Sequence, residues 1–169
     1  MKTLYITDLD GTMLNSDGNL SDISSKAIKT LIKKGVLFSV ATARTAATVT
    51  DMFKNTGLKT PIALMNGVCI YDTEQRKNVI THSIDKSIAE KVLSFYAEHN
   101  KHPMLYFDKG EFLEIVYTEI DNVHQYEYIT DRNVRKLKKF IKTDKYSLDC
   151  DDELLYIVSF DKPDELCEI

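Results

Sequence analysis

A short apolar stretch that ends in two aspartates places the strongest constraint on the fold of this chain. Leu4 to Thr7 has the pattern of a β-strand, and Asp8 and Asp10 follow it directly. Residues at positions i and i+2 of an extended chain point the same way, so both carboxylates can face one site. Gly11 then lets the backbone turn sharply. Ligands bind at the carboxyl ends of the strands in an open α/β sheet, so we expect a site here.

Asp8 and Asp10 predict a bound divalent cation, because the sequence places no Lys or Arg beside them. Carboxylate oxygens suit Mg²⁺, which typically takes one or two carboxylates together with waters and a substrate phosphate. The alternative is an acidic turn whose aspartates only cap backbone amides. We expect both residues to be metal ligands.

The residues that follow predict a β-α-β unit. Ser21 is a favourable N-cap, and apolar residues recur at helical spacing from Ile23 to Ile32. Gly35 suits the position after that helix. Val36 to Ala41 is a nearly continuous apolar run, which is typical of a parallel strand buried on both faces. If this strand pairs with the first, Thr42 at its end lies beside Asp8.

Three runs carry a resemblance to a known family. Asp8-Leu9-Asp10-Gly11-Thr12 after an apolar strand resembles motif I, D-x-D-G-T, of the haloacid dehalogenase (HAD) superfamily. Ala41-Thr42-Ala43-Arg44 resembles the A-T-G-R run of the Cof-type (subclass IIB) members, with Ala43 in place of their glycine. Asn66-Gly67 resembles their N-G-A run, and it also predicts a hairpin turn.

The resemblance implies an α/β fold with a Rossmann-like parallel core that is only partly present. Residues 1–82 would form the N-terminal part of that core, and residues 83–169 an incomplete, inserted α+β cap domain of the C2 type. The C-terminal part of the core would be absent from this chain. The pattern of the second half predicts a helix capped by Asp85 and another from Asn133 to Ile141. It also predicts strands at Met104–Phe107, Phe112–Tyr117 and Leu154–Phe160.

The resemblance also implies a Mg²⁺-dependent phosphatase of small phosphorylated metabolites, such as sugar phosphates. Asp8 would be the nucleophile that forms an aspartyl-phosphate. Asp10 would protonate the leaving group, and Asp8 nearby would raise its pKa for that role. The groups that would bind phosphate are the backbone amides of Leu9 and Asp10, with Thr42, Arg44, Asn66 and Gly67. Thr42 could instead be an ordinary N-cap. Arg44 could contact the acids of the site, since its planar fork suits carboxylates, or it could be a solvated side chain.

The later motifs of the family, a lysine and a second set of acids, have no match in this chain. We therefore interpret it as the N-terminal portion of a longer phosphatase, weakly active or inactive alone. The alternatives are a phosphate-binding or phospho-accepting module without turnover, a phosphomutase, and a structural fragment that retains motif I as a relic.

The composition of the sequence gives information on the binding partners and the cellular compartment of this protein. The net charge of −4, without a basic stripe, gives no support for nucleic-acid binding, and no apolar run reaches the length of a membrane span. Cys69, Cys150 and Cys167 form no close pair, which indicates free thiols and a cytoplasmic protein. A core that lacks its later strands would leave an apolar sheet edge exposed, so self-association through that edge is expected.

Overall fold

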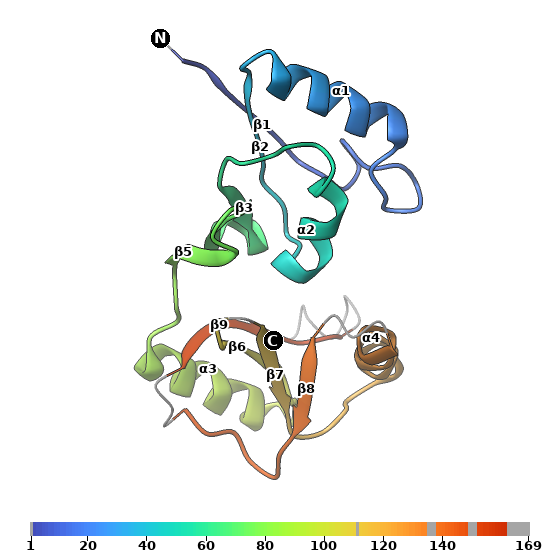
Figure 1. Cartoon of the computed structure of the whole chain (residues 1–169). Helices are drawn as coiled ribbons and strands as arrows, with labels where there is room; N and C mark the ends of the chain where they lie inside the picture. The colour runs from blue at the N-terminus through green and yellow to red at the C-terminus, as the bar shows by residue number, and fades with distance from the viewer. Residues whose placement is uncertain (1, 111, 135–137, 149–151, 162–169) are drawn as a thin grey trace. The chain divides into compact units, whose positions relative to one another are not determined.

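The computed structural model describes residues 2–110, 112–134, 138–148 and 152–161 (Figure 1). The chain divides into two compact units, Met1–His82 and Ser83–Ile169. Each unit combines helices with its own strands. The α/β class predicted from the sequence is confirmed.

The first unit begins with the predicted β-α-β unit. Strand β1 (Leu4–Thr7) is followed by helix α1 (Asp22–Lys33) and strand β2 (Leu37–Val40). The two strands are parallel, and Leu4 is opposite Leu37. This pairing is confirmed, and it brings the ends of β1 and β2 to the same edge of the sheet.

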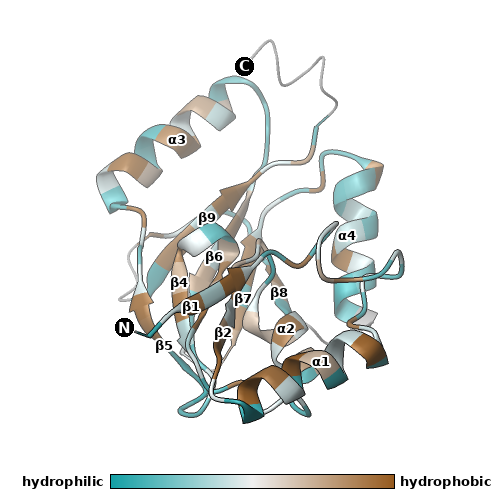
Figure 2. Ribbon diagram, turned by 90° about the horizontal axis from the view of Figure 1, so that it is seen from above, coloured by the Kyte–Doolittle hydropathy of each residue, from teal (hydrophilic) through white to brown (hydrophobic). Residues whose placement is uncertain are grey.

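Local signals explain where α1 begins and ends. The Ser21 hydroxyl accepts a hydrogen bond from the Ser24 N–H at 3.1 Å, which satisfies a free amide of the first turn. After the helix, Gly35 adopts a φ of 83°, a conformation that costs glycine little. Figure 2 shows hydrophobic and hydrophilic bands alternating along α1. Ile28 is buried, whereas Ile23 is 82% exposed.

The rest of the first unit consists of one helix and a three-stranded antiparallel sheet. Helix α2 (Ala46–Phe53) leads to β3 (Ile62–Leu64), β4 (Cys69–Asp72) and β5 (Lys77–Thr81). A parallel bridge from Ala41 to Ala63 joins the end of β2 to β3. The hairpin predicted at Asn66-Gly67 is confirmed, because β3 and β4 pair on either side of it.

Strand β1 is poorly covered. Among the described residues it pairs with β2 alone. Leu4, Tyr5 and Ile6 are 47%, 58% and 59% exposed. Since alternate residues of a strand point to opposite faces, both faces of β1 are open as well as its free edge.

The second unit is built on a four-stranded sheet in the order β8-β7-β6-β9. Its elements are α3 (Lys86–Glu98), β6 (Met104–Asp108), β7 (Leu113–Tyr117), α4 (Val123–Val134), β8 (Lys139–Lys142) and β9 (Glu153–Val158). Ala89 of α3 packs in one buried cluster with Leu105, Phe107 and Leu154. The strands predicted at Met104, Phe112 and Leu154 are therefore confirmed, with small shifts in their bounds.

The helix predicted from Asn133 to Ile141 is wrong over its second half. Lys139–Lys142 forms β8, which pairs in parallel with β7 and places Phe140 opposite Ile115. The helix of this region, α4, ends at Val134. Helical spacing of apolar residues gave no sign of this, because the strand is specified by a partner more than twenty positions away.

Candidate active site

The loop after β1 holds the two acids on either side of one buried residue. Leu9 is fully buried, and its carbonyl accepts hydrogen bonds from the amides of Thr12, Met13 and Leu14 at 2.9–3.2 Å. Asp8 and Asp10 are both exposed. The buried Leu9 thus anchors the turn that presents the two carboxylates to solvent.

Thr42 lies at the end of the neighbouring strand, as expected from the pairing of β1 with β2. The Ala41 amide donates to the Thr7 carbonyl at 2.9 Å, which continues the parallel pairing past the strands. Thr42 itself is only 5% exposed, and its hydroxyl accepts a hydrogen bond from the Arg44 amide at 3.2 Å. The hydroxyl therefore has a backbone partner of the kind expected for an ordinary turn.

Asn66 joins the same cluster through its backbone. Its amide donates to the Thr42 carbonyl at 3.0 Å, and the Met65 amide donates to the Arg44 carbonyl at 3.0 Å. Met65 and Asn66 have φ angles of 52° and 57°, and Gly67 has 89°. Left-handed backbone at a residue other than glycine costs free energy, so this tight turn is fixed by the segment to which it bonds.

Arg44 binds one of the two acids directly. Its Nε and Nη2 donate to the two carboxylate oxygens of Asp10 at 2.9 and 2.6 Å. The Arg44 side chain is 25% exposed and that of Asp10 is 55% exposed. No Lys or Arg is next to the two acids in the sequence, but the fold brings Arg44 into an ion pair with Asp10.

This contact reverses the expected electrostatics of Asp10. The hydrogen bonds and charge of Arg44 lower the pKa of the Asp10 carboxyl, and partial burial offsets this only in part. The same hydrogen bonds raise the pKa of Arg44. The expectation that Asp8 raises the pKa of Asp10 is wrong for this arrangement, because the bidentate Arg44 favours the ionised carboxyl and lowers its pKa.

Two residues that the sequence did not single out also belong to this cluster. A Cβ at Gly18 would lie 2.9 Å from Nη2 of Arg44, so the loop around Gly18 packs against the guanidinium. Thr45, at the start of α2, is 7% exposed, and its hydroxyl has no hydrogen-bond partner among the described residues. Glycine in a turn and threonine before a helix are too common for the sequence to mark them.

The described residues fit a Mg²⁺ site in part. Asp8 offers an exposed carboxylate, and the structure gives it no ion pair within the described ranges. Asp10 is engaged by Arg44. In the part of the chain that the structure describes, no three His, Cys, Asp or Glu side chains form a metal-binding group. The two aspartates could supply one or two oxygen ligands, with water and phosphate completing the shell.

The structure bears only in part on the expectations about the cysteines, the membrane and the cellular location. Cys69 is buried, while Cys150 and Cys167 lie outside the described residues. None of the described helices has the length and apolar character needed to span a bilayer. The cytoplasmic location stays a prediction.

This chain is similar in sequence to two phosphatases of Bacillus subtilis. Phosphatase YwpJ of Bacillus subtilis is 36% identical over 101 residues, which cover 59% of this chain and 34% of that protein. The 5-amino-6-(5-phospho-D-ribitylamino)uracil phosphatase YwtE of the same organism is 34% identical over 97 residues, covering 56% and 33%. The chain thus spans about a third of the length of each relative.

Solved structures share the fold at low identity. TM0651 from Thermotoga maritima aligns with 99% of this chain and 60% of its own, with a TM-score of 0.73 and 20% identity. A haloacid dehalogenase-like hydrolase from Bacteroides thetaiotaomicron covers 99% and 61%, with a TM-score of 0.72 and 16% identity. The family model of haloacid dehalogenase-like hydrolases matches residues 5–169, almost the whole sequence. The chain therefore belongs to the haloacid dehalogenase-like hydrolase family.

Proposed function

We propose that this chain carries the nucleophile-bearing part of a phosphatase that acts on small phosphorylated metabolites. The observation that supports it most directly is the cluster at the ends of β1 and β2. The exposed Asp8 and Asp10 lie in the loop after β1, and Arg44, which follows β2, pairs with Asp10. The phosphatases YwpJ and YwtE are relatives of this chain, and the name of YwtE identifies a small phosphorylated compound as its substrate.

In the proposed reaction, the Asp8 carboxylate attacks phosphorus while the bond from phosphorus to the leaving oxygen breaks. Asp10 gives a proton to that oxygen. A water then attacks the aspartyl-phosphate and returns its proton to Asp10, which releases phosphate and restores Asp8. A carboxylate is itself a nucleophile, so the proposed attack by Asp8 needs no activating base.

Arg44 gives this reaction a substrate-dependent step. While its guanidinium holds both oxygens of Asp10, that carboxyl stays ionised and cannot donate a proton. A phosphate dianion offers the same planar fork a competing partner of higher charge. We propose that substrate phosphate draws Arg44 away from Asp10, which removes the main cause of the lowered pKa. The negative charge of the bound phosphate then favours the protonated Asp10 carboxyl, which can act as the proton donor.

Mg²⁺ is the proposed cofactor, held by the Asp8 carboxylate, with Asp10 as a further oxygen ligand while its carboxyl is ionised. The ion would supply positive charge against the phosphoryl oxygens. Thr42, Asn66, Gly67 and the backbone of Leu9 and Asp10 are the proposed phosphate-binding groups. The second unit, residues 83–169, is proposed to act as a C2-type cap domain that selects the substrate.

A phospho-accepting module without turnover is the second candidate. The low pKa of Asp10 favours it, because an ionised Asp10 with Arg44 in place is a poor proton donor for the first step. Under this alternative, Asp8 would be phosphorylated by a reactive phosphoryl donor whose leaving group needs no proton, and the adduct would persist.

The deciding experiment is release of phosphate from 4-nitrophenyl phosphate with and without Mg²⁺. We expect release that is abolished by Asp8→Asn and by a chelator, and unchanged by Asp144→Asn, an exposed aspartate in the second unit. Release that survives Asp8→Asn would contradict the proposal. A stable adduct at Asp8 with acetyl phosphate, without turnover, would select the phospho-accepting module.

A further inference from the structure

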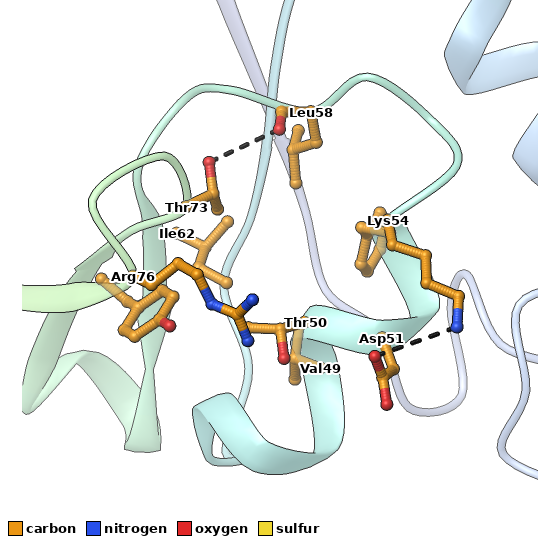
Figure 3. Close-up of a pocket in the computed structure, with 10 residues that line it drawn as sticks. Val49, Thr50, Asp51, Lys54, Leu58, Ile62, Thr73 and Arg76 are labelled. Carbon is orange, nitrogen blue, oxygen red and sulfur yellow. Dashed lines mark hydrogen bonds and ion pairs between the residues drawn. The ribbon is translucent and has the colours of Figure 1, made fainter. Parts of the chain in front are cut away.

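A pocket of about 310 Å³ lies in the first unit, and neither of the two acids lines it. Figure 3 shows this pocket. Its walls come from the second half of α2, the start of β3, the end of β4 and the turn that follows β4. The lining residues are Val49, Thr50, Asp51, Phe53, Lys54, Leu58, Ile62, Tyr71, Thr73 and Arg76.

The position of this pocket separates it from the proposed phosphatase site. Ile62 begins β3, whereas the turn at Met65 and Asn66, which bonds to Arg44 and Thr42, follows the end of that strand. Helix α2 likewise begins beside Arg44 and reaches the pocket with Val49 and later residues. The pocket thus lies at the start of β3, whereas the turn that bonds to Thr42 and Arg44 follows its end. Substrates of open α/β sheets bind at the carboxyl ends of the strands.

The floor of the pocket is apolar, and its rim carries polar and charged side chains. Val49, Phe53, Ile62 and Tyr71 are 0–8% exposed, and Leu58 is half-buried beside them. A volume near 300 Å³ is at the lower end of the range for small-molecule sites, which are mostly apolar with a few placed polar groups. A ligand here would bury an apolar body of modest size.

The polar side chains at the opening leave one uncompensated positive charge. The Nζ of Lys54 lies 4.0 Å from a carboxylate oxygen of Asp51, so these two opposite charges face one another. The Arg76 guanidinium has no ion-pair partner among the described residues. Figure 3 shows its side chain reaching across the pocket toward Thr50, while Lys54 reaches toward Asp51.

The backbone turn that positions Arg76 requires a left-handed conformation, which costs conformational free energy. The Asp72 carboxylate accepts the amides of Glu74 and Gln75 at 2.8 Å, and the Asp72 carbonyl accepts the Arg76 amide at 2.8 Å. This turn gives Arg76 a φ of 57°, which glycine or asparagine would adopt more easily. Left-handed arginine in a fixed turn is a feature that accompanies functional positions.

We propose that this pocket is a second ligand site, which binds a small amphipathic monoanion with an apolar body and a carboxylate head group. The body would lie over the apolar floor beside Leu58, Phe53 and Tyr71, and the carboxylate would pair with Arg76. Arginine suits this role because its planar fork matches a carboxylate. The proposal is independent of the phosphate chemistry at Asp8.

The test is methyl NMR of the complete 169-residue chain, labelled at Ile, Leu and Val, during titration with octanoate. We expect saturable shifts at Val49, Leu58 and Ile62. Arg76→Gln should weaken binding about tenfold, because it removes a hydrogen-bonded charge. Lys29→Gln, which changes the net charge equally on exposed α1, should leave the affinity unchanged. Octan-1-ol should bind about tenfold more weakly than octanoate.

Thr50→Trp provides an independent check, since the larger side chain would occupy the pocket while Arg76 stays in place. It should abolish the octanoate shifts. Equal affinity for octanoate and octan-1-ol, equal affinity in Arg76→Gln, or shifts at Leu4 and Ile6 in place of the pocket methyls would overturn the proposal. Arg76 is exposed, so its variant remains informative even if Thr50→Trp fails to fold.

Discussion

The guanidinium of Arg44 holds both carboxylate oxygens of Asp10, at 2.9 and 2.6 Å, across 34 positions of sequence. It thereby fixes the charge of the residue that has to donate a proton in the proposed reaction. The pair ties the loop after β1 to the segment after β2, and the loop around Gly18 packs against the same guanidinium. The protonation of Asp10 is therefore coupled to the conformation of two neighbouring loops.

Arg44→Gln should raise the pKa of Asp10 toward its ordinary value near 3.8, because the hydrogen bonds from Arg44 are the main cause of its lowering. The measurement is the pH titration of the Asp10 carboxyl carbon by NMR. Lys29→Gln serves as the control for net charge. An unchanged Asp10 titration in Arg44→Gln would mean that the ion pair does not persist in solution.

The same substitution has a defined effect on stability. The folded-state pKa of Asp10 lies below its unfolded value, so the pair stabilises the folded chain above about pH 4. That contribution is lost as the pH falls through the lowered pKa. Because Asp10 is half-exposed, solvent screening limits the contribution to less than about 1 kcal/mol. Denaturant unfolding of wild type and Arg44→Gln should differ at pH 6 and converge below the folded-state pKa of Asp10.

Gly11→Ala and Gly18→Ala form a matched pair that separates backbone strain from disturbance of Arg44. Both glycines have φ angles near +70°, so each alanine should cost about 1–2 kcal/mol of stability. A Cβ at Gly11 meets open space, whereas at Gly18 it would lie 2.9 Å from Nη2 of Arg44. Only Gly18→Ala should raise the pKa of Asp10. Equal Asp10 titrations in the two variants would contradict the packing of this loop on Arg44.

The elements nearest the acids could be predicted because their signals are local. Ser21 and Gly35 delimit α1, and the continuous apolar run predicts β2 without knowledge of its partner. A contact between Arg44 and the acids was one of the alternatives that the sequence left open, and the structure confirms it. The sequence could not select it, because the two residues are far apart along the chain and arginine also suits a solvated helix start. Strand β8 was missed for a related reason: the register of Phe140 against Ile115 comes from pairing with β7.

Leu9 and Asp8 are adjacent, yet their substitutions should affect different properties. We expect Leu9→Ala to lower the stability of the fold and Asp8→Asn to remove turnover with little change in stability. Leu9 is fully buried, so Leu9→Ala should destabilise the first unit by about 2–5 kcal/mol through the cavity it leaves. Asp8→Asn removes an exposed carboxylate and should change the free energy of unfolding by less than about 0.5 kcal/mol. Thermal and denaturant unfolding of both variants measure the contrast. A large loss of stability in Asp8→Asn would show that its loss of turnover reports unfolding.

The open strand β1 predicts self-association between copies of this chain. It pairs on one side within the described residues, and Leu4, Tyr5 and Ile6 are about half exposed. Unpaired N–H and C=O groups with apolar side chains on both faces form a template for another strand, and we propose that a second copy pairs along this edge. Sedimentation velocity over a range of concentrations should show a larger species that Tyr5→Lys and Ile6→Lys weaken. A charge on either face of the edge strand opposes its pairing.

Val123→Lys, at an exposed apolar position of α4, is the matched control and should leave association unchanged. A chain that stays monomeric at high concentration, or association that Val123→Lys disrupts as strongly, would contradict the role of β1.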